Sequence, residues 1–187
     1  MTVELLAEPA ELRRWLELDD DDTDALSDER ATLLLEGASS SVLAYCRRRT
    51  FAEVEDTVTL DGNGAYELLL PGAPVTAVSA VTEDPDGDGT DLLVDVEWSA
   101  DGILRRTAGG RFVRRFRWYT VTFTHGYETV PEAVRNVVLR VAARGVSNPE
   151  GLATEGIGGY NAGFAFDDTR LPTLSAPERR ELGPFCL

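Results

Sequence analysis

The chain has 187 residues, of which 43% are hydrophobic and 27% are charged, and these proportions exclude wholesale disorder. The length fits one domain, with room for an inserted lobe and for a sizeable hydrophobic core. The formal net charge of -15 argues against a general nucleic-acid-binding protein, because neutralising phosphates requires an excess of basic residues.

The N-terminal part contains two stretches of helical periodicity. Residues 9–17 begin with proline, which suits a first helical turn, and carry their apolar side chains on one face. Residues 24–48 keep the same periodicity, and acidic residues in the first turn suit the helix dipole. We therefore expect a short amphipathic helix followed by one long helix. Trp15 and Tyr45 lie on the apolar stripes of these helices and are predicted to be core residues.

The periodicity changes from helical to alternating at Val54, and alternation continues to about residue 124. This pattern predicts an inserted antiparallel β region over residues 54–124, with about five or six strands. The turn-rich residues 61–64 predict a hairpin near its beginning. The alternating apolar residues over 92–98 predict a further strand.

Two capping signals predict helices in the C-terminal part. Residues 131–146 begin with an early proline and carry a valine-rich stripe, which favours a helix. The segment that follows, to about residue 170, is rich in glycine with isolated aromatic side chains, so it cannot build its own core. A second capping signal at 175–178 predicts a short last helix, which Gly183 and Pro184 end.

The expected fold class is therefore α+β. A small helical bundle, with its long helix and flanking helices, carries the inserted antiparallel β region and an extended C-terminal arm. We expect the body to span residues 1–147 and the arm to span residues 148–187, with a short terminal helix.

Cysteine usage and hydropathy indicate the compartment. Cys46 and Cys186 are far apart in sequence and lack metal-ligand spacing, so we expect neither a disulfide scaffold nor a zinc site. The N-terminus has no basic segment followed by an apolar stretch, and no apolar run approaches the roughly 20 residues of a membrane span. These features predict assembly in a reducing cytoplasm, with no membrane partner.

Asp84, Asp86, Asp88 and Asp95 form a weak candidate metal site. Their spacing matches much of an EF-hand calcium loop, in which oxygen ligands alternate along the chain. The segment lacks helical flanks, however, and Asp95 stands where the usual bidentate Glu would be. An exposed acidic turn is the favoured interpretation, and a β-rich calcium-binding or adhesion module is the alternative function.

Six arginines between residues 105 and 117, interleaved with aromatic side chains, allow two interpretations. One is contact with a nucleic-acid backbone combined with base stacking. The other is pairing with acidic groups of a neighbouring subunit. Pairing is favoured, because the net charge of the chain is wrong for DNA binding.

The sequence shows no catalytic constellation. His125 is the only histidine, and it follows a predicted strand with no nucleophile motif of the G-x-S-x-G type nearby. Carboxylate pairs are so plentiful in an acidic chain that they carry no specificity for acid–base chemistry. We therefore expect no enzymatic activity, no catalytic residue and no cofactor.

The order of these elements resembles the head-to-tail connector (adaptor or head-completion) proteins of tailed bacteriophages. The similarity extends over nearly the whole chain and rests on the order of local segments rather than on any one of them. These segments are residues 41–48, 74–78, 121–127, Val130-Pro131, 140–143, 148–160 and 175–180.

This resemblance implies a structural protein of the virion neck. Family members form a ring, here expected to be twelvefold, that joins the portal protein to a stopper, head-completion or tail protein. Genomic DNA would pass through the ring without sequence-specific binding, and an acidic lumen would repel its phosphates. Isolated aromatic residues in the arm suit docking, so the predicted portal- or subunit-binding residues are Tyr160, Phe164, Phe166 and Phe185.

Overall fold

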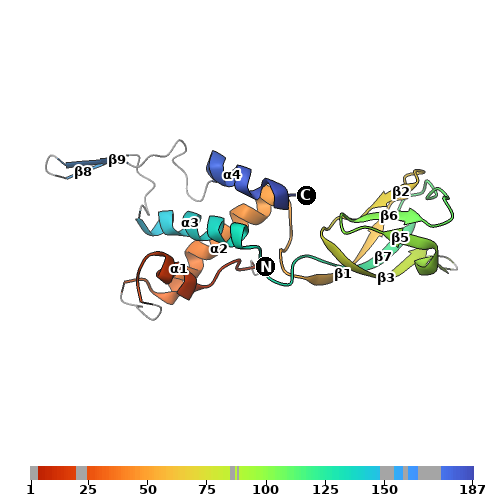
Figure 1. Ribbon diagram of the computed structural model, residues 1–187, viewed down its shortest axis with the longest axis horizontal. Coiled ribbons are helices and arrows are strands. Elements are labelled where there is room, and N and C mark those ends of the chain that lie inside the picture. Colours follow the sequence, from red (N-terminus) through yellow and green to blue (C-terminus); the bar gives the residue numbers. More distant parts are fainter. Residues whose placement is uncertain are drawn as a thin grey trace. The chain divides into compact units, whose positions relative to one another are not determined.

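The computed structural model describes residues 4–19, 25–84, 87, 89–147, 154–157, 160–163 and 174–187, with side chains described outside 147–173. The chain divides into two compact units. Residues Met1–Arg49 and Val130–Cys186 form what we call the helical unit, and Thr50–Thr129 form the β unit (Figure 1). The β unit is thus inserted between two helices of the helical unit, as the change of periodicity at Val54 predicted.

Three helices of the helical unit agree closely with the sequence pattern: α1 (Pro9–Trp15), α2 (Asp28–Cys46) and α3 (Glu132–Ser147). The side chain of Ser27 caps α2 by accepting a hydrogen bond from the backbone N–H of Arg30. The apolar stripes of the two long helices are buried, and the helices pack against each other. The fully or nearly fully buried residues on these stripes are Ala31, Leu35, Ala38, Val42, Val134, Val137, Val138 and Val141.

The last helix, α4 (Ala176–Leu182), continues into a short 3-10 turn, Gly183–Phe185. A capping box begins α4, because the side chains of Ser175 and Glu178 each accept a backbone hydrogen bond from the other residue. This helix packs against α3 and α2 and buries Leu182 completely. The end of the chain was predicted as part of an extended arm. The structure instead places α4 within the helical unit, because its apolar side chains complete that core.

Between α3 and α4, the structure describes the backbone of residues 154–157 and 160–163. Strands β8 (Thr154–Ile157) and β9 (Tyr160–Gly163) form an antiparallel hairpin in which Ile157 pairs with Tyr160. The sequence did not predict this hairpin, because the glycine-rich composition hides any alternation of apolar side chains.

The β unit contains two antiparallel sheets. One has the strand order β1-β7-β3-β4, formed by Val54–Leu60, Tyr119–His125, Val75–Glu83 and Thr90–Asp91. The other has the order β2-β6-β5, formed by Glu67–Leu69, Ile103–Arg106 and Val96–Trp98. Side chains from both sheets share one core, which includes Leu68, Val81, Leu104, Phe112, Tyr119, Val121 and Phe123.

The two ends of the β unit are joined to each other by backbone hydrogen bonds. The N–H of Glu53 donates to the carbonyl of Tyr127 at 3.0 Å, and the N–H of Tyr127 donates to the carbonyl of Phe51 at 2.9 Å. The rings of Phe51 and Tyr127 stack beside these bonds, with centroids 6.3 Å apart. The chain therefore enters and leaves the β unit at one place.

The α+β class is confirmed, but several local predictions for the β region are wrong. Residues 61–64 connect two different sheets instead of forming a hairpin, because β1 pairs with β7 over its whole length. Residues 54–125 form seven described strands, more than the five or six expected, because β2, β4 and β5 are too short for periodicity to reveal. Only Val96–Trp98 of the predicted strand 92–98 is extended, because a 3-10 turn, Leu93–Asp95, precedes it.

The predicted burial of Trp15 and Tyr45 is also wrong, since the exposed fraction of Trp15 is 44% and that of Tyr45 is 40%. Helical spacing placed both correctly on a stripe, but both lie near a helix end, where less of the neighbouring structure covers them. In the described part of the chain, no helix has both the length and the apolar character needed to span a bilayer.

Candidate interaction surfaces

The first candidate surface is the segment between β6 and β7, residues 107–118, which we call the Arg-rich loop. Residues 102–127 around it contain six arginines and no acidic residue, in a chain whose net charge is -15. Such a local excess of one sign creates a positive patch on an otherwise acidic protein. The loop is therefore the most distinctive electrostatic feature of the β unit.

Backbone hydrogen bonds hold the Arg-rich loop against the connection between β1 and β2. Gly62 and Arg115 exchange two of them, with N–H to carbonyl oxygen distances of 2.7 and 3.2 Å. The N–H of Arg117 donates to the Asp61 carboxylate at 2.7 Å. The N–H of Phe112 donates to the carbonyl of Ala65 at 2.8 Å. These bonds hold the backbone of the loop in place. The backbone would therefore lose little conformational entropy when the loop binds a partner.

A cluster of hydrogen-bonded polar side chains around Glu83 connects the Arg-rich loop to the sheets of the β unit. The Glu83 carboxylate accepts hydrogen bonds from Arg106 at 2.9 Å, from the Trp118 indole at 3.1 Å and from the Tyr119 hydroxyl at 3.2 Å. The Tyr119 hydroxyl in turn accepts a hydrogen bond from the N–H of Val113 at 2.7 Å. Burial alone would raise the pKa of Glu83, but the bonds from Arg106 and Trp118 outweigh it and lower that pKa. Glu83 is therefore a stable anion that fixes Arg106.

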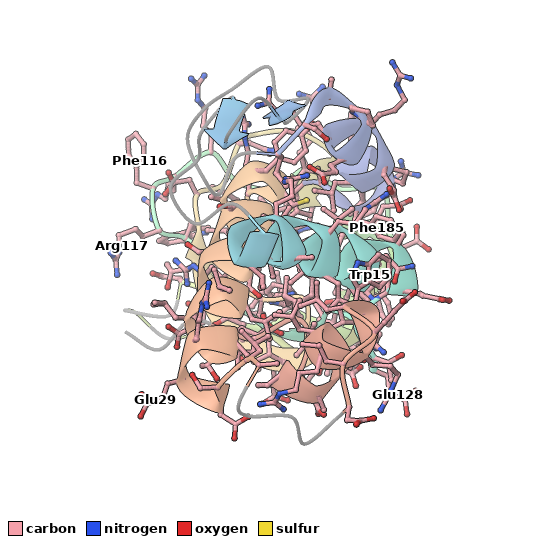
Figure 2. The ribbon with its side chains drawn as sticks, turned by 90° about the vertical axis from the view of Figure 1, so that its left-hand side faces the viewer. Trp15, Glu29, Phe116, Arg117, Glu128 and Phe185 are labelled. Carbon is pink, nitrogen blue, oxygen red and sulfur yellow. The ribbon has the colours of Figure 1, made fainter. Side chains whose placement is uncertain are left out.

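The outer side of the Arg-rich loop presents one aromatic ring among cationic groups. Phe116 is 88% exposed, and the side chains of Phe116 and Arg117 point outward from the loop (Figure 2). The guanidinium of Arg115 lies 4.3 Å from the Trp118 ring centroid, which is a cation–π geometry. Among the described residues, no carboxylate forms an ion pair with Arg111, Arg114, Arg115 or Arg117.

The other two arginines of the run have partners within the chain. Arg106 pairs with Glu83 at 2.9 Å, and Arg105 pairs with Glu67 across neighbouring strands. The two arginines with an ion-pair partner, Arg105 and Arg106, lie on β6, whereas the four others lie in the loop. The fold therefore separates the two arginines that pair within the chain from the four in the loop.

The second candidate surface is the C-terminal helix and its attachment to the helical unit. Arg144 on α3 forms a bidentate ion pair with Glu178 on α4, with distances of 2.6 and 3.1 Å. The Glu178 side chain is only 4% exposed. Burial would raise its pKa, but hydrogen bonds from Arg144 and Ser175 outweigh burial and lower it. The ion pair therefore remains charged at neutral pH.

More contacts follow towards the end of the chain. The hydroxyl of Tyr45 on α2 donates to the carbonyl of Arg179 at 3.2 Å. The Nε of Arg48 donates to the carbonyl of Phe185 at 2.6 Å. The sulfur atoms of Cys46 and Cys186 lie 2.9 Å apart. The C-terminal segment is thus attached to the end of α2 and to the residues that follow it.

The predicted binding residues are only partly covered by the structure. Phe185, which is labelled in Figure 2, is half-buried. The Nε of Arg48 donates a hydrogen bond to its backbone carbonyl. Tyr160 lies on β9, where only the backbone is described, and Phe164 and Phe166 lie outside the described residues. Their role in binding a portal or a neighbour stays a prediction. Phe116 was not among the predicted portal-binding residues, but it is one of the aromatic residues of the Arg-rich run that the sequence analysis singled out as a possible contact surface.

The candidate metal site also stays a prediction. Asp86 and Asp88 lie outside the described residues, and the described part of the chain contains no group of three His, Cys, Asp or Glu residues that could hold a metal ion. The backbone carbonyl of Asp84 accepts hydrogen bonds from the N–H groups of Gly87 and Gly89, at 3.1 and 3.2 Å. Asp84 therefore closes a turn, as the structural interpretation of this acidic segment expected.

Comparison with known proteins gives matches only among solved structures. No protein-family model matches the chain, and no curated protein matches it. A chain in the neck of an empty gene transfer agent (GTA) particle with C6 symmetry is 19% identical, with a TM-score of 0.55 and 82% of each chain covered.

Two further structures show the same likeness. A chain in the virion of a native GTA particle is 20% identical, with a TM-score of 0.53 and 83% of each chain covered. A chain in the neck of a native GTA particle with C12 symmetry is 17% identical, with a TM-score of 0.51, covering 86% of this chain and 88% of the other. At these identities the likeness establishes a shared fold, and at that level it confirms the predicted resemblance to connector proteins.

Proposed function

We propose that the protein is a structural component of the neck of a tailed bacteriophage or of a related gene-transfer particle, and not an enzyme. In this role it forms a head-to-tail adaptor ring that joins the portal protein to the stopper or tail and lines the DNA channel. The observation that carries the proposal is the fold shared with GTA neck chains over at least 82% of this chain. Assembly would take place in the host cytoplasm, before incorporation into the virion.

The symmetry of the neighbours supports a closed ring. Their necks were computed with C6 and C12 symmetry, and a rotation that closes produces a ring from identical head-to-tail contacts. A twelvefold ring is therefore the state that we propose for this chain. Each subunit of such a ring needs two different surfaces that complement each other.

The Arg-rich loop fits one of these two surfaces. Subunits with a charge of -15 repel one another, so a stable ring needs local positive groups at its contacts. Arg111, Arg114 and Arg117 supply such groups without an ion pair in the described part of their own chain. Phe116 supplies an exposed aromatic anchor among them. The loop would therefore contact an acidic surface of the neighbouring subunit.

Electron microscopy of the purified protein, alone and mixed with the portal of the same particle, tests the neck role. We expect closed rings that bind one end of the portal, because a template raises the effective concentration of subunits. A protein that remains monomeric and does not bind the portal would contradict the proposal.

The same experiment tests the aromatic residues of the arm. Changing Tyr160, Phe164 and Phe166 to Ser should abolish portal binding without lowering the melting temperature, if these residues dock on the portal. Deleting residues 150–187 would be a poor test, because it removes the buried Leu174 and Leu182 from the helical unit.

The double variant Arg114→Glu/Arg117→Glu tests the proposed contact between subunits. We expect ring association to weaken at least about tenfold, because two attractive charges become repulsive, and the loss should shrink at high salt. Sedimentation velocity over a concentration series measures this change. The melting temperature should stay within about 2 °C, since surface substitutions of this kind have small effects on stability.

Arg105→Gln is the control, because Arg105 is also exposed but already has Glu67 as its partner. It should leave association unchanged. If the double variant assembles normally but the protein loses residual affinity for DNA, the loop faces nucleic acid and the subunit contact lies elsewhere.

A further inference from the structure

The fold brings together the two cysteines that the sequence keeps apart. Cys46 ends α2 and Cys186 follows the 3-10 turn after α4, 140 positions further along the chain. Their sulfur atoms are nevertheless 2.9 Å apart, and the S–S bond of a disulfide is about 2.05 Å long. Only a small approach of the two side chains is needed to form that bond.

The surroundings hold both cysteines in place. The hydrogen bond from Arg48 to the carbonyl of Phe185, at 2.6 Å, fixes the residue before Cys186 next to the end of α2. The Cys186 thiol also lies 3.3 Å from the carbonyl of Leu182. The pair therefore lies within one rigid helical arrangement, which favours ring closure between the two thiols over reactions with other molecules.

We propose that Cys46 and Cys186 form an intramolecular disulfide when the protein meets a small-molecule disulfide oxidant, and that this bond ties the C-terminal segment covalently to the end of α2. The proposal does not depend on the neck role. The sequence predicted no disulfide and both cysteines are free thiols in the structure, so the proposal rests on their proximity alone.

The reaction proceeds by two thiol–disulfide exchanges with, for example, oxidised glutathione. The Cys186 thiolate first attacks one glutathione sulfur, so that the glutathione S–S bond breaks and one glutathione leaves as a thiol. The Cys46 thiolate then attacks the Cys186 sulfur and releases the second glutathione, which takes up the other proton. Two protein thiols are oxidised, and one glutathione disulfide is reduced to two thiols.

The order of attack follows from exposure. Cys186 is partly exposed, whereas Cys46 is fully buried. Burial, followed by the hydrogen bond with Cys186, raises the pKa of Cys46 to about 12. Cys46 is therefore a poor nucleophile towards an oxidant in solution. The second step is intramolecular, and the hydrogen bond that raises the Cys46 pKa is lost once Cys186 carries glutathione.

Intact-protein and peptide mass spectrometry after incubation with reduced and oxidised glutathione tests the proposal. The folded wild-type protein should lose the mass of two hydrogen atoms and yield one cross-linked peptide pair containing Cys46 and Cys186. The oxidised form should exceed the dithiol at least about tenfold at equal concentrations of the two glutathione forms. The melting temperature of the helical signal in circular dichroism should rise by about 5–15 °C.

Two single variants are the matched controls. Cys46→Ser should take up one glutathione at Cys186, because the resolving thiol is gone. Cys186→Ser should react at least about tenfold more slowly while it remains folded, because only the buried thiol is left. The proposal is wrong if the wild type carries stable glutathione without a cross-link, forms only intermolecular disulfides, or stays reduced. Equal reactivity of the two single variants would overturn the proposed order of attack.

Discussion

Changing Glu178 to Gln should lower the free energy of unfolding of the helical unit by about 3 kcal/mol. The substitution keeps the shape of the side chain and a capping oxygen for the N–H of Ser175, but it removes the negative charge next to Arg144. The Arg144 side chain is 17% exposed, so in the variant its guanidinium keeps a charge with little access to water and without its bidentate partner. Urea unfolding followed by circular dichroism in the helical region measures the loss.

Glu181→Gln is the control for this experiment, because Glu181 also pairs with an α3 arginine, Arg140. The Arg140 and Glu181 side chains are 39% and 36% exposed, so water screens their attraction. We expect this control to cost less than about 1 kcal/mol. Equal losses in the two variants would show that burial of the Glu178 pair contributes nothing.

The same pair predicts a pH dependence with a defined sign. The pKa of Glu178 in the folded protein lies below its ordinary value of 4.5, so the unfolded chain binds a proton at Glu178 more readily than the folded protein. The stabilisation is therefore complete above the unfolded-state pKa and is lost as the pH falls through the lower, folded-state pKa. The difference in stability between wild type and Glu178→Gln should accordingly shrink as the pH drops below about 4.

Gly62→Ala should displace the Arg-rich loop and destabilise the β unit by about 2–4 kcal/mol. A Cβ atom at Gly62 would lie 1.7 Å from the carbonyl oxygen of Val113 and 2.9 Å from a ring carbon of Tyr119. The first neighbour is backbone, so the loop must move to relieve the clash. That movement breaks the two hydrogen bonds between Gly62 and Arg115. Thermal unfolding, with fluorescence to report the surroundings of Trp118, measures both effects.

Gly110→Ala, in the same loop, provides the matched control. Its new Cβ would meet only the Cδ of the Arg106 side chain, at 3.3 Å, and a flexible side chain can move away. We expect a change of less than about 0.5 kcal/mol. If Gly62→Ala is also neutral, the loop is not held by the connection between β1 and β2. Ring association should fall with Gly62→Ala, since the proposed contact depends on the position of Phe116.

The helices were predictable because each one is specified locally. Residues 131–146 contain a proline, a capping signal and a valine stripe within one segment, and the structure has α3 at Glu132–Ser147. The pairing of strands could not be predicted in this way, because β1 pairs with β7, from which it is separated by about 60 positions, and not with β2. Residues 61–64 do leave strand β1 as the turn-rich composition indicated, but they connect it to a strand of the other sheet.

The candidate surfaces show the same limit. The run of arginines is visible in sequence, but only the fold separates Arg106, which Glu83 binds, from Arg117, which points outward. The proximity of Cys46 and Cys186 depends on α4 packing against α2 and α3, a tertiary contact that no local pattern encodes. Spacing along the chain therefore could not predict that the two free thiols lie side by side.

The backbone bonds that join residues 51–53 to residue 127 have a consequence for evolution. The chain enters and leaves the β unit at one place. Recombination could therefore exchange the whole β unit without altering the coding sequence of the helical unit. The β unit could then change in sequence and structure while the helical unit keeps its fold.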